Sequence, residues 1–239
     1  MLSDTEETGN CEQDAQEKLE TTTMRVKVYK RRFWMLFLFS SLSLLCGIMY
    51  PLYTITADVT KCYYSVSQEA VNWTGLLYMV VYIILFVPVS SSVHKIGLRK
   101  TVLCISLFNT IASACQFATL KPNNFGYVMV SQFLGSLANV SVLALPPVLA
   151  AVWFPNRQLS RACAFGVFSN QMGVGLGFLL TPFMVSSDCS KPELIEEGKF
   201  KVAVTLSVLN ITVLSLISFT FQKEPLYPPS EAQEFKENS

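Results

Sequence analysis

Three amide side chains lie deep within long apolar stretches of this sequence, and they are the first candidates for chemistry. They are Asn139, Asn170 and Gln171. An amide without a hydrogen-bond partner is costly in hydrocarbon, so each one must face either a neighbouring helix or a water-lined cavity. The pattern favours a cavity for Asn170 and Gln171 and leaves both interpretations open for Asn139.

A second group of candidates is the run Tyr50-Pro51-Leu52-Tyr53. Proline frees a backbone carbonyl and can bend a helix, and residues three apart lie on one helix face, so we expect Tyr50 and Tyr53 to present their rings to the same side. Amide side chains and aromatic rings can bind a solute, but they do not by themselves indicate catalysis. The apolar stretches contain no cluster of His, Asp or Glu that could do acid–base or metal chemistry. We therefore expect a protein that is not an enzyme and that needs no metal or other cofactor.

The elements that position these residues are apolar segments, each long enough for a helix to cross a bilayer, which takes about 20 residues. The segments lack the alternation that a closed barrel needs, so they predict an all-α membrane protein. We expect six transmembrane helices, at residues 34–57, 71–93, 101–119, 125–152, 162–186 and 202–221.

The sequence divides into three regions of different composition. Residues 1–33 form a polar, acidic leader that ends in a basic stretch, and we expect the leader to be disordered because it has too few apolar residues to offset the entropy of ordering. Residues 34–221 form the transmembrane domain. Residues 222–239 contain closely spaced prolines and glutamates and indicate an exposed linker or tail.

The basic residues predict the orientation, because cytoplasmic loops carry an excess of Lys and Arg. With the leader inside, Lys100 and Arg157 are inside as well, whereas Lys199 and Lys201 fall in an outer loop. We expect a multi-pass protein of the plasma membrane with both termini in the cytoplasm. The net charge of only +1 suggests no nucleic-acid partner.

Cys62 and Cys189 differ from the cysteines that fall within the apolar segments. Both are expected in outer loops, where an oxidising compartment allows a disulfide to persist. The sequence leaves two alternatives open, a bridge between them or two unpaired thiols.

The segment from Ser90 to Lys100 resembles a motif of the major facilitator superfamily. That motif lies between the second and third spans, and this segment has the same place and spacing. In this interpretation His94, Lys95, Gly97 and Arg99 form a gating loop. Glycine allows a tight turn between two helices, and the two cations can bind helix-end carbonyls and carboxylates. Serine replaces the first glycine of the motif at residue 90, and His94 replaces its aspartate.

Further short motifs recur in the same order along the membrane region. Together they resemble the feline leukaemia virus subgroup C receptor-related family of transporters, and the tail from residue 225 to 233 looks like the start of that family's central linker. The resemblance covers the N-terminal six-span half of a twelve-span major facilitator fold. The motifs are Val28-Tyr-Lys-Arg-Arg32, Asn72-Trp73, Tyr78-Met79, Gly97-Leu-Arg99, Ala151-Val-Trp-Phe154 and Phe168-Ser-Asn-Gln-Met-Gly173.

The resemblance implies a transporter that moves choline and ethanolamine by alternating access, with haem transport also attributed to the family. A choline-type cation is held in an aromatic cage by cation–π attraction. Tyr50 stands where the family has a cage tryptophan, and Asn139 stands where it has glutamine. The resemblance therefore implies a substrate site made of Tyr50, Tyr53, Asn139, Asn170 and Gln171.

In this superfamily the cavity lies between two six-helix halves, and the resemblance covers only the first. We therefore expect either a homodimer or a partnership with a missing C-terminal half. The alternative function is a non-transporting membrane receptor or regulatory subunit that associates with a full-length carrier.

Overall fold

The computed structural model describes residues 30–222, apart from the side chain of His94. The predicted leader up to residue 29 and the tail from residue 223 lie outside this range. The described part is helical throughout its regular elements, and six of the helices are long and apolar enough to cross a membrane, so the predicted fold class is confirmed. These six are α2 (Arg31–Met49), α4 (Gln68–Ile96), α5 (Leu98–Cys115), α6 (Phe125–Ala144), α8 (Leu159–Met184) and α9 (Pro192–Thr220). The short elements are α3 (Ala57–Tyr64), η1 (Gln116–Leu120), α7 (Pro146–Trp153) and η2 (Asn156–Gln158).

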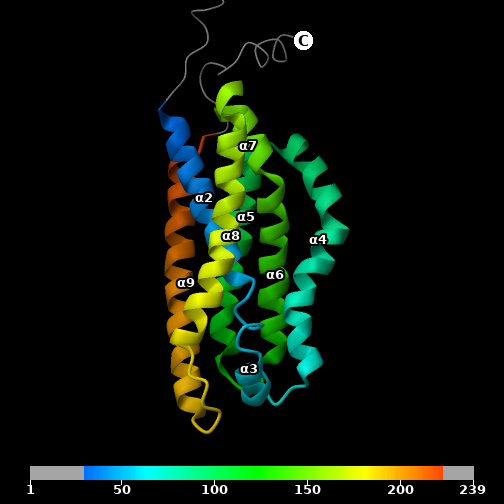
Figure 1. The fold of residues 1–239 in the computed structure, drawn as a ribbon, viewed down its shortest axis with the longest axis vertical. Helices are drawn as coiled ribbons and strands as arrows, with labels where there is room; N and C mark the ends of the chain where they lie inside the picture. Colours follow the sequence, from blue (N-terminus) through cyan, green and yellow to red (C-terminus); the bar gives the residue numbers. More distant parts are fainter. Residues whose placement is uncertain (1–29, 223–239) are drawn as a thin grey trace, which may run out of the picture.

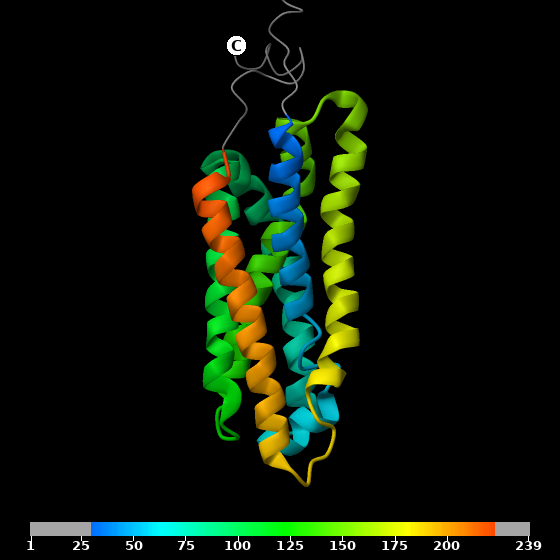
Figure 2. The ribbon, with the colours of Figure 1, turned by 90° about the vertical axis from the view of Figure 1, so that its left-hand side faces the viewer.

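The long helices run side by side along one axis, and the first and last described residues lie at the same end of the bundle (Figures 1 and 2). That end, here called the basic end, carries Arg31, Lys95, Arg99, Lys100 and Arg157. The opposite end holds α3, η1 and the loop between α8 and α9 (Figure 1). It is called the disulfide end, for the bridge described below.

Burial separates central helices from outlying ones. Half of the most apolar stretch of α2, and half of that of α6, is buried inside the bundle, compared with 17% for α4 and 28% for α8. The helix α2 packs mainly against α8, whereas α6 packs against α4 and α5. The helices α4 and α8 therefore flank the bundle and leave broad apolar faces uncovered.

The first segment is shorter than predicted, because α2 ends at Met49 and residues 50–56 form turns. Pro51 has no N–H to donate to the preceding helical turn, and its ring crowds that turn. The hydroxyls of Thr54 and Thr56 then donate to the carbonyls of Pro51 and Leu52, at 3.1 and 3.0 Å. The expectation that Tyr50 and Tyr53 share one helix face is therefore wrong.

Two other predicted boundaries also move. The segment predicted at 125–152 is two helices, because Pro146 and Pro147 lack the N–H groups that would continue α6, and Pro146 instead begins α7. The last helix begins at Pro192, well before the predicted residue 202, since its first turns are polar and an apolar window does not detect them. Proline is well tolerated at this first position.

A seam of glycines brings the backbones of α2 and α8 into contact. A Cβ atom added at Gly173 would overlap the carbonyl of Leu44, and one added at Gly47 would overlap the carbonyl of Asn170. At Gly177 an added Cβ would lie 2.6 Å from Cγ of Pro51. Small residues allow such close approach in membranes, where van der Waals packing drives helix association.

We expect Gly173→Ala to destabilise the bundle by about 1–3 kcal/mol, because the new methyl group meets rigid backbone and the helices must move apart. Gly175→Ala is the matched control, since nothing lies within 4 Å of a Cβ added there. Thermal unfolding of the purified chain in detergent, followed by size-exclusion chromatography, measures the difference. Equal melting temperatures for the two variants would contradict close backbone packing of α2 against α8 at Gly173.

Candidate functional site

The aromatic pair Tyr50 and Tyr78 lies where the end of α2 meets α4. Their ring centroids are 5.0 Å apart and the rings meet edge to face at 68°. Tyr78 is 5% exposed, and its hydroxyl is buried with no hydrogen-bond partner among the described residues. That hydroxyl lies against Gly135 of α6.

Asn139 lies one turn beyond Gly135 on α6, so it is on the same side of that helix as the tyrosine pair. It is partly buried, and its Oδ1 accepts a hydrogen bond from Asn170. The structure thus places the predicted site residue Tyr50 against Tyr78, which the sequence did not assign to a site, and places Asn139 one turn further along α6.

Asn170 is a link between helices. It is 2% exposed, and its Nδ2 donates to the carbonyl of Ser43 on α2 and to Oδ1 of Asn139 on α6, both at 3.0 Å. The adjacent Gln171 is exposed on the surface of α8. Neighbours on a helix point about 100° apart, so one amide joins the core while the other leaves it.

Gln132 is a polar residue that the sequence did not single out. It lies one turn before Gly135 on α6 and is fully buried, and within residues 30–222 neither atom of its amide has a partner. The signal was present in the sequence, since an amide within an apolar segment is the same feature that identified Asn139.

Tyr53 belongs to a different cluster, at the disulfide end. It is 7% exposed, its hydroxyl lies 3.3 Å from Oγ1 of Thr119, and its ring centroid lies 6.0 Å from Nζ of Lys199. Lys199 was expected in an outer loop, but it lies in the second turn of α9 and its side chain is half-buried. No local pattern indicates this burial, because only the tertiary structure brings the turn after α2 and the start of α9 together.

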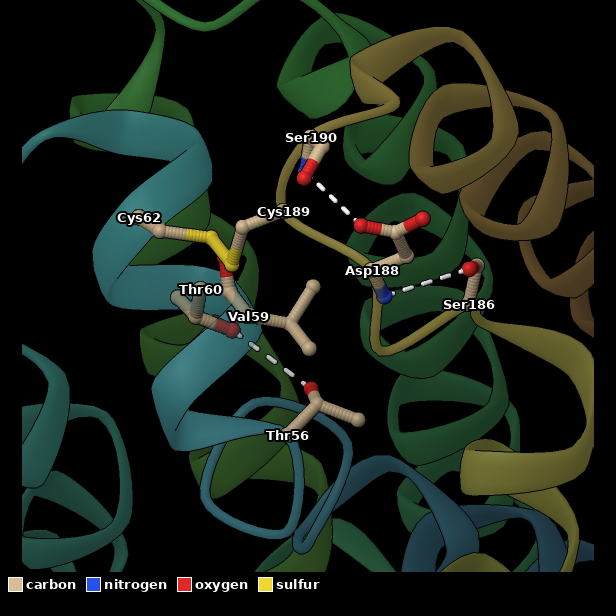
Figure 3. Close-up of a disulfide and its surroundings, with 8 residues drawn as sticks. All are labelled: Thr56, Val59, Thr60, Cys62, Ser186, Asp188, Cys189 and Ser190. Atoms are coloured by element: carbon tan, nitrogen blue, oxygen red, sulfur yellow. Dashed lines mark hydrogen bonds between the residues drawn. A yellow bond between two sulfur atoms is a disulfide. The ribbon is translucent and has the colours of Figure 1, made fainter.

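A disulfide joins Cys62 of α3 to Cys189 of the loop between α8 and α9, with Cα atoms 6.3 Å apart (Figure 3). The loop is shaped by its own polar groups: the backbone N–H of Asp188 donates to Ser186 Oγ at 3.3 Å, and the N–H of Ser190 donates to Asp188 Oδ1 at 3.0 Å. The bridge links residues 127 positions apart and therefore fixes α3 to the start of α9.

The predicted gating loop is almost entirely helical. His94 and Lys95 lie in the last turns of α4, which continues past Pro88 and ends at Ile96, just before Gly97. Gly97 alone separates α4 from α5 and has a φ of 88°, which favours glycine. Arg99 donates to the carbonyl of Ser218, near the end of α9, at 3.3 Å. The gating role of these residues stays a prediction.

Comparisons with known proteins agree on the class of this chain. A family model described as Major Facilitator Superfamily matches residues 32–235. The chain is 36% identical over 207 residues to the choline/ethanolamine transporter flvcr2a of Danio rerio, covering 87% of the chain and 44% of that protein. It is 33% identical over 208 residues to the human choline/ethanolamine transporter FLVCR2, covering 87% of the chain and 39% of that protein.

A third relative is an uncharacterized MFS-type transporter of Caenorhabditis elegans, 36% identical over 220 residues, which covers 92% of the chain and 36% of the relative. The chain therefore spans about two fifths of the length of the curated relatives it matches, with shares of 36%, 44% and 39%.

We expect Asn170→Leu to destabilise the bundle by about 1–3 kcal/mol, because the carbonyl of Ser43 and the oxygen of Asn139 lose their shared donor inside the core. Gln171→Leu is the matched control on the next residue and should leave stability within about 0.5 kcal/mol, since that side chain is exposed. Thermal unfolding in detergent compares them. If Gln171→Leu proves the more damaging, the assignment of the two amides is reversed.

Proposed function

The chain belongs to the Major Facilitator Superfamily, and from this premise we propose that it moves a small organic cation of the choline or ethanolamine class across a membrane. Two relatives are choline/ethanolamine transporters, which supports the substrate class. The observation that carries the proposal is the Tyr50–Tyr78 pair, because it combines ring faces with a buried hydroxyl that has no partner in the described structure.

Each part of this pair suits part of such a substrate. An ammonium group is attracted to the face of an aromatic ring, and more strongly where water is excluded. Tyr50 is only partly buried, so its ring is accessible to a solute, whereas Tyr78 is held in the core. The Tyr78 hydroxyl and the amide of Asn139 can then bind the hydroxyl of the substrate.

Asn170 acts in this scheme through Asn139. Its hydrogen bond fixes the oxygen of Asn139, and its second bond ties both residues to α2. Asn170 is therefore a positioning residue. A large ligand such as haem would gain little from these few polar groups.

We also propose that the uncovered faces of α4 and α8 pack against a second six-helix unit, with the solute cavity between the two. The exposed amide of Gln171 supports this, because a lipid-facing amide on α8 would lack a hydrogen-bond partner. Exposed apolar side chains on both helices supply the contact area. They include Trp73, Met79 and Ile83 on α4 and Phe168, Met172 and Leu179 on α8.

Tyr50 provides the sharpest test of substrate recognition. In an assembly that takes up labelled choline, Tyr50→Ala should weaken binding by about 1–2 kcal/mol, roughly 5- to 30-fold in Kd. Tyr50→Trp should preserve or improve binding, since tryptophan is the stronger cation–π partner. Tyr50→Leu keeps an apolar side chain without the ring, so choline binding equal to the parent at equal expression would refute the cation–π site.

The assembly can be tested by uptake into vesicles together with a measurement of stoichiometry. We expect saturable uptake of labelled choline or ethanolamine only in vesicles whose protein contains at least two six-helix units, because one unit leaves Gln171 without a partner. Gln171→Leu should lower uptake more than it lowers stability. Saturable uptake by a demonstrably monomeric preparation of this chain would disprove the proposal, and complete absence of flux from every assembly would favour the receptor alternative.

The orientation, with the basic end in the cytoplasm and the disulfide end outside, can be tested with one reagent. An impermeant maleimide added to intact cells should label Cys62→Ser, in which Cys189 is a free thiol, but should not label the parent at Cys189, which is bridged. Lys100→Cys, at the basic end, should stay unlabelled until the cells are opened. Labelling of Lys100→Cys from outside would reverse the orientation.

A further inference from the structure

The ammonium group of Lys199 lies within three tyrosine rings at the disulfide end, here called the tyrosine cage: Tyr53, Tyr63 and Tyr64. Its Nζ is 4.0 Å from the centroid of Tyr64, 4.4 Å from that of Tyr63 and 6.0 Å from that of Tyr53. All three rings are buried, with exposed fractions of 6–7%. Cation–π attraction operates within about 6 Å of a ring centroid, so each ring of the cage is within reach.

The head group of Lys199 is also held by hydrogen bonds. It donates to the hydroxyl of Tyr64 and, at 3.3 Å, to the carbonyl of Thr119. Burial raises the pKa of the Tyr64 hydroxyl, and burial together with Glu196 raises the pKa of the Tyr63 hydroxyl. Both tyrosines on α3 therefore remain neutral phenols near neutral pH, and the attraction comes from ring faces and hydrogen bonds.

The cage is held in place by contacts that do not involve Lys199. The Tyr63 hydroxyl donates to the carbonyl of Leu120, and the Tyr64 hydroxyl donates to that of Thr119, so both tyrosines are anchored on η1. The disulfide at Cys62, next to Tyr63 in the sequence, also fixes α3. Such a preorganised arrangement binds a cation without paying again for the ordering of its rings.

A small pocket adjoins the cage. Its lining includes Tyr53, Tyr63 and the side chain of Lys199, together with Thr56 and Thr60. Tyr50 and Tyr78, which carry the proposed transport site, do not line this pocket. The cage is thus a separate location in the fold, between α3, η1 and α9.

We propose that the tyrosine cage is a second binding site, for small primary ammonium ions, in which Lys199 is a tethered occupant that such ions displace. The chemistry of Lys199 defines the ligand class, because a primary ammonium can repeat both of its hydrogen bonds, whereas a quaternary ammonium has no N–H to donate to Thr119. A tethered group competes at an effective concentration on the millimolar scale, so the site responds only to abundant free cation.

The test uses ethylammonium chloride as the probe and a Tyr50→Leu background, so that the proposed transport site does not contribute. In that background Lys199→Met vacates the cage while keeping an unbranched side chain, and calorimetry should show ethylammonium binding at least about tenfold tighter than without the substitution. Tetramethylammonium should bind more weakly, and uncharged 1-propanol should not bind. Lys201→Met is the matched control, because Lys201 is exposed and pairs with Glu197 at 2.8 Å; it should create no binding.

Adding Tyr64→Leu to the Lys199→Met protein should reduce ethylammonium binding by at least about tenfold, since the nearest ring is lost. A Lys199→Met protein that elutes as a folded species but binds no ethylammonium overturns the proposal. So does equal binding by the Lys201→Met control.

A measurement on the unsubstituted cage covers the case in which Lys199→Met fails to fold. In protein made with lysine labelled with ¹³C at Cε, which leaves all three N–H groups of the ammonium in place, the Lys199 Cε signal should be shifted by the ring currents of the cage. Ethylammonium well above about 10 mM should move that signal towards the position of the exposed Lys201 signal. A Lys199 signal that does not move under these conditions refutes displacement.

Discussion

The close contact between α2 and α8 is the constraint on which the rest of this structure depends. Inside a bilayer there is no water to drive helices together by the hydrophobic effect. The two backbones must therefore approach closely enough for van der Waals contacts and hydrogen bonds to hold the helices together. Glycines at 47, 173 and 177 permit that approach. Once it is made, Asn170 lies near enough to α2 and α6 to bond to both, and the turn after α2 presents Tyr50 towards α4.

The tyrosines at the two proposed sites form two groups that differ in their surroundings and therefore in what they can bind. Tyr50 and Tyr78 meet edge to face, and the hydroxyl of Tyr78 is buried without a partner in the described region, so this pair retains binding capacity. The tyrosine cage has its hydroxyls engaged with η1 and its faces turned to Lys199. The Tyr50–Tyr78 pair therefore offers an unmet hydrogen bond, whereas the cage offers ring faces that Lys199 already occupies.

The two ends of the bundle are held by different chemistry. At the basic end, Arg99 reaches the last turn of α9, and Gly97 alone connects α4 to α5. At the disulfide end, the Cys62–Cys189 bridge and the tyrosine cage both tie α3 to the region of α9. A covalent link combined with a half-buried lysine makes this end the more strongly fastened one, and the solute path of the proposed transporter must accommodate that restraint.

The sequence by itself determined the membrane helices, their number and the family, because apolar length and short motifs are local properties of the chain. It also identified Tyr50, Asn139 and the pair of cysteines as residues of interest. Only the tertiary structure decided that Tyr53 lies near Lys199 and not near Tyr50, and that Asn170 joins helices while Gln171 is exposed. It also decided that the Tyr78 hydroxyl and the Gln132 amide are buried without hydrogen-bond partners in the described residues. The reason is physical. The turn at Pro51 changes the direction in which the next side chains point, so helix spacing no longer predicts their positions. The contacts of a buried polar group depend on which helices pack against it.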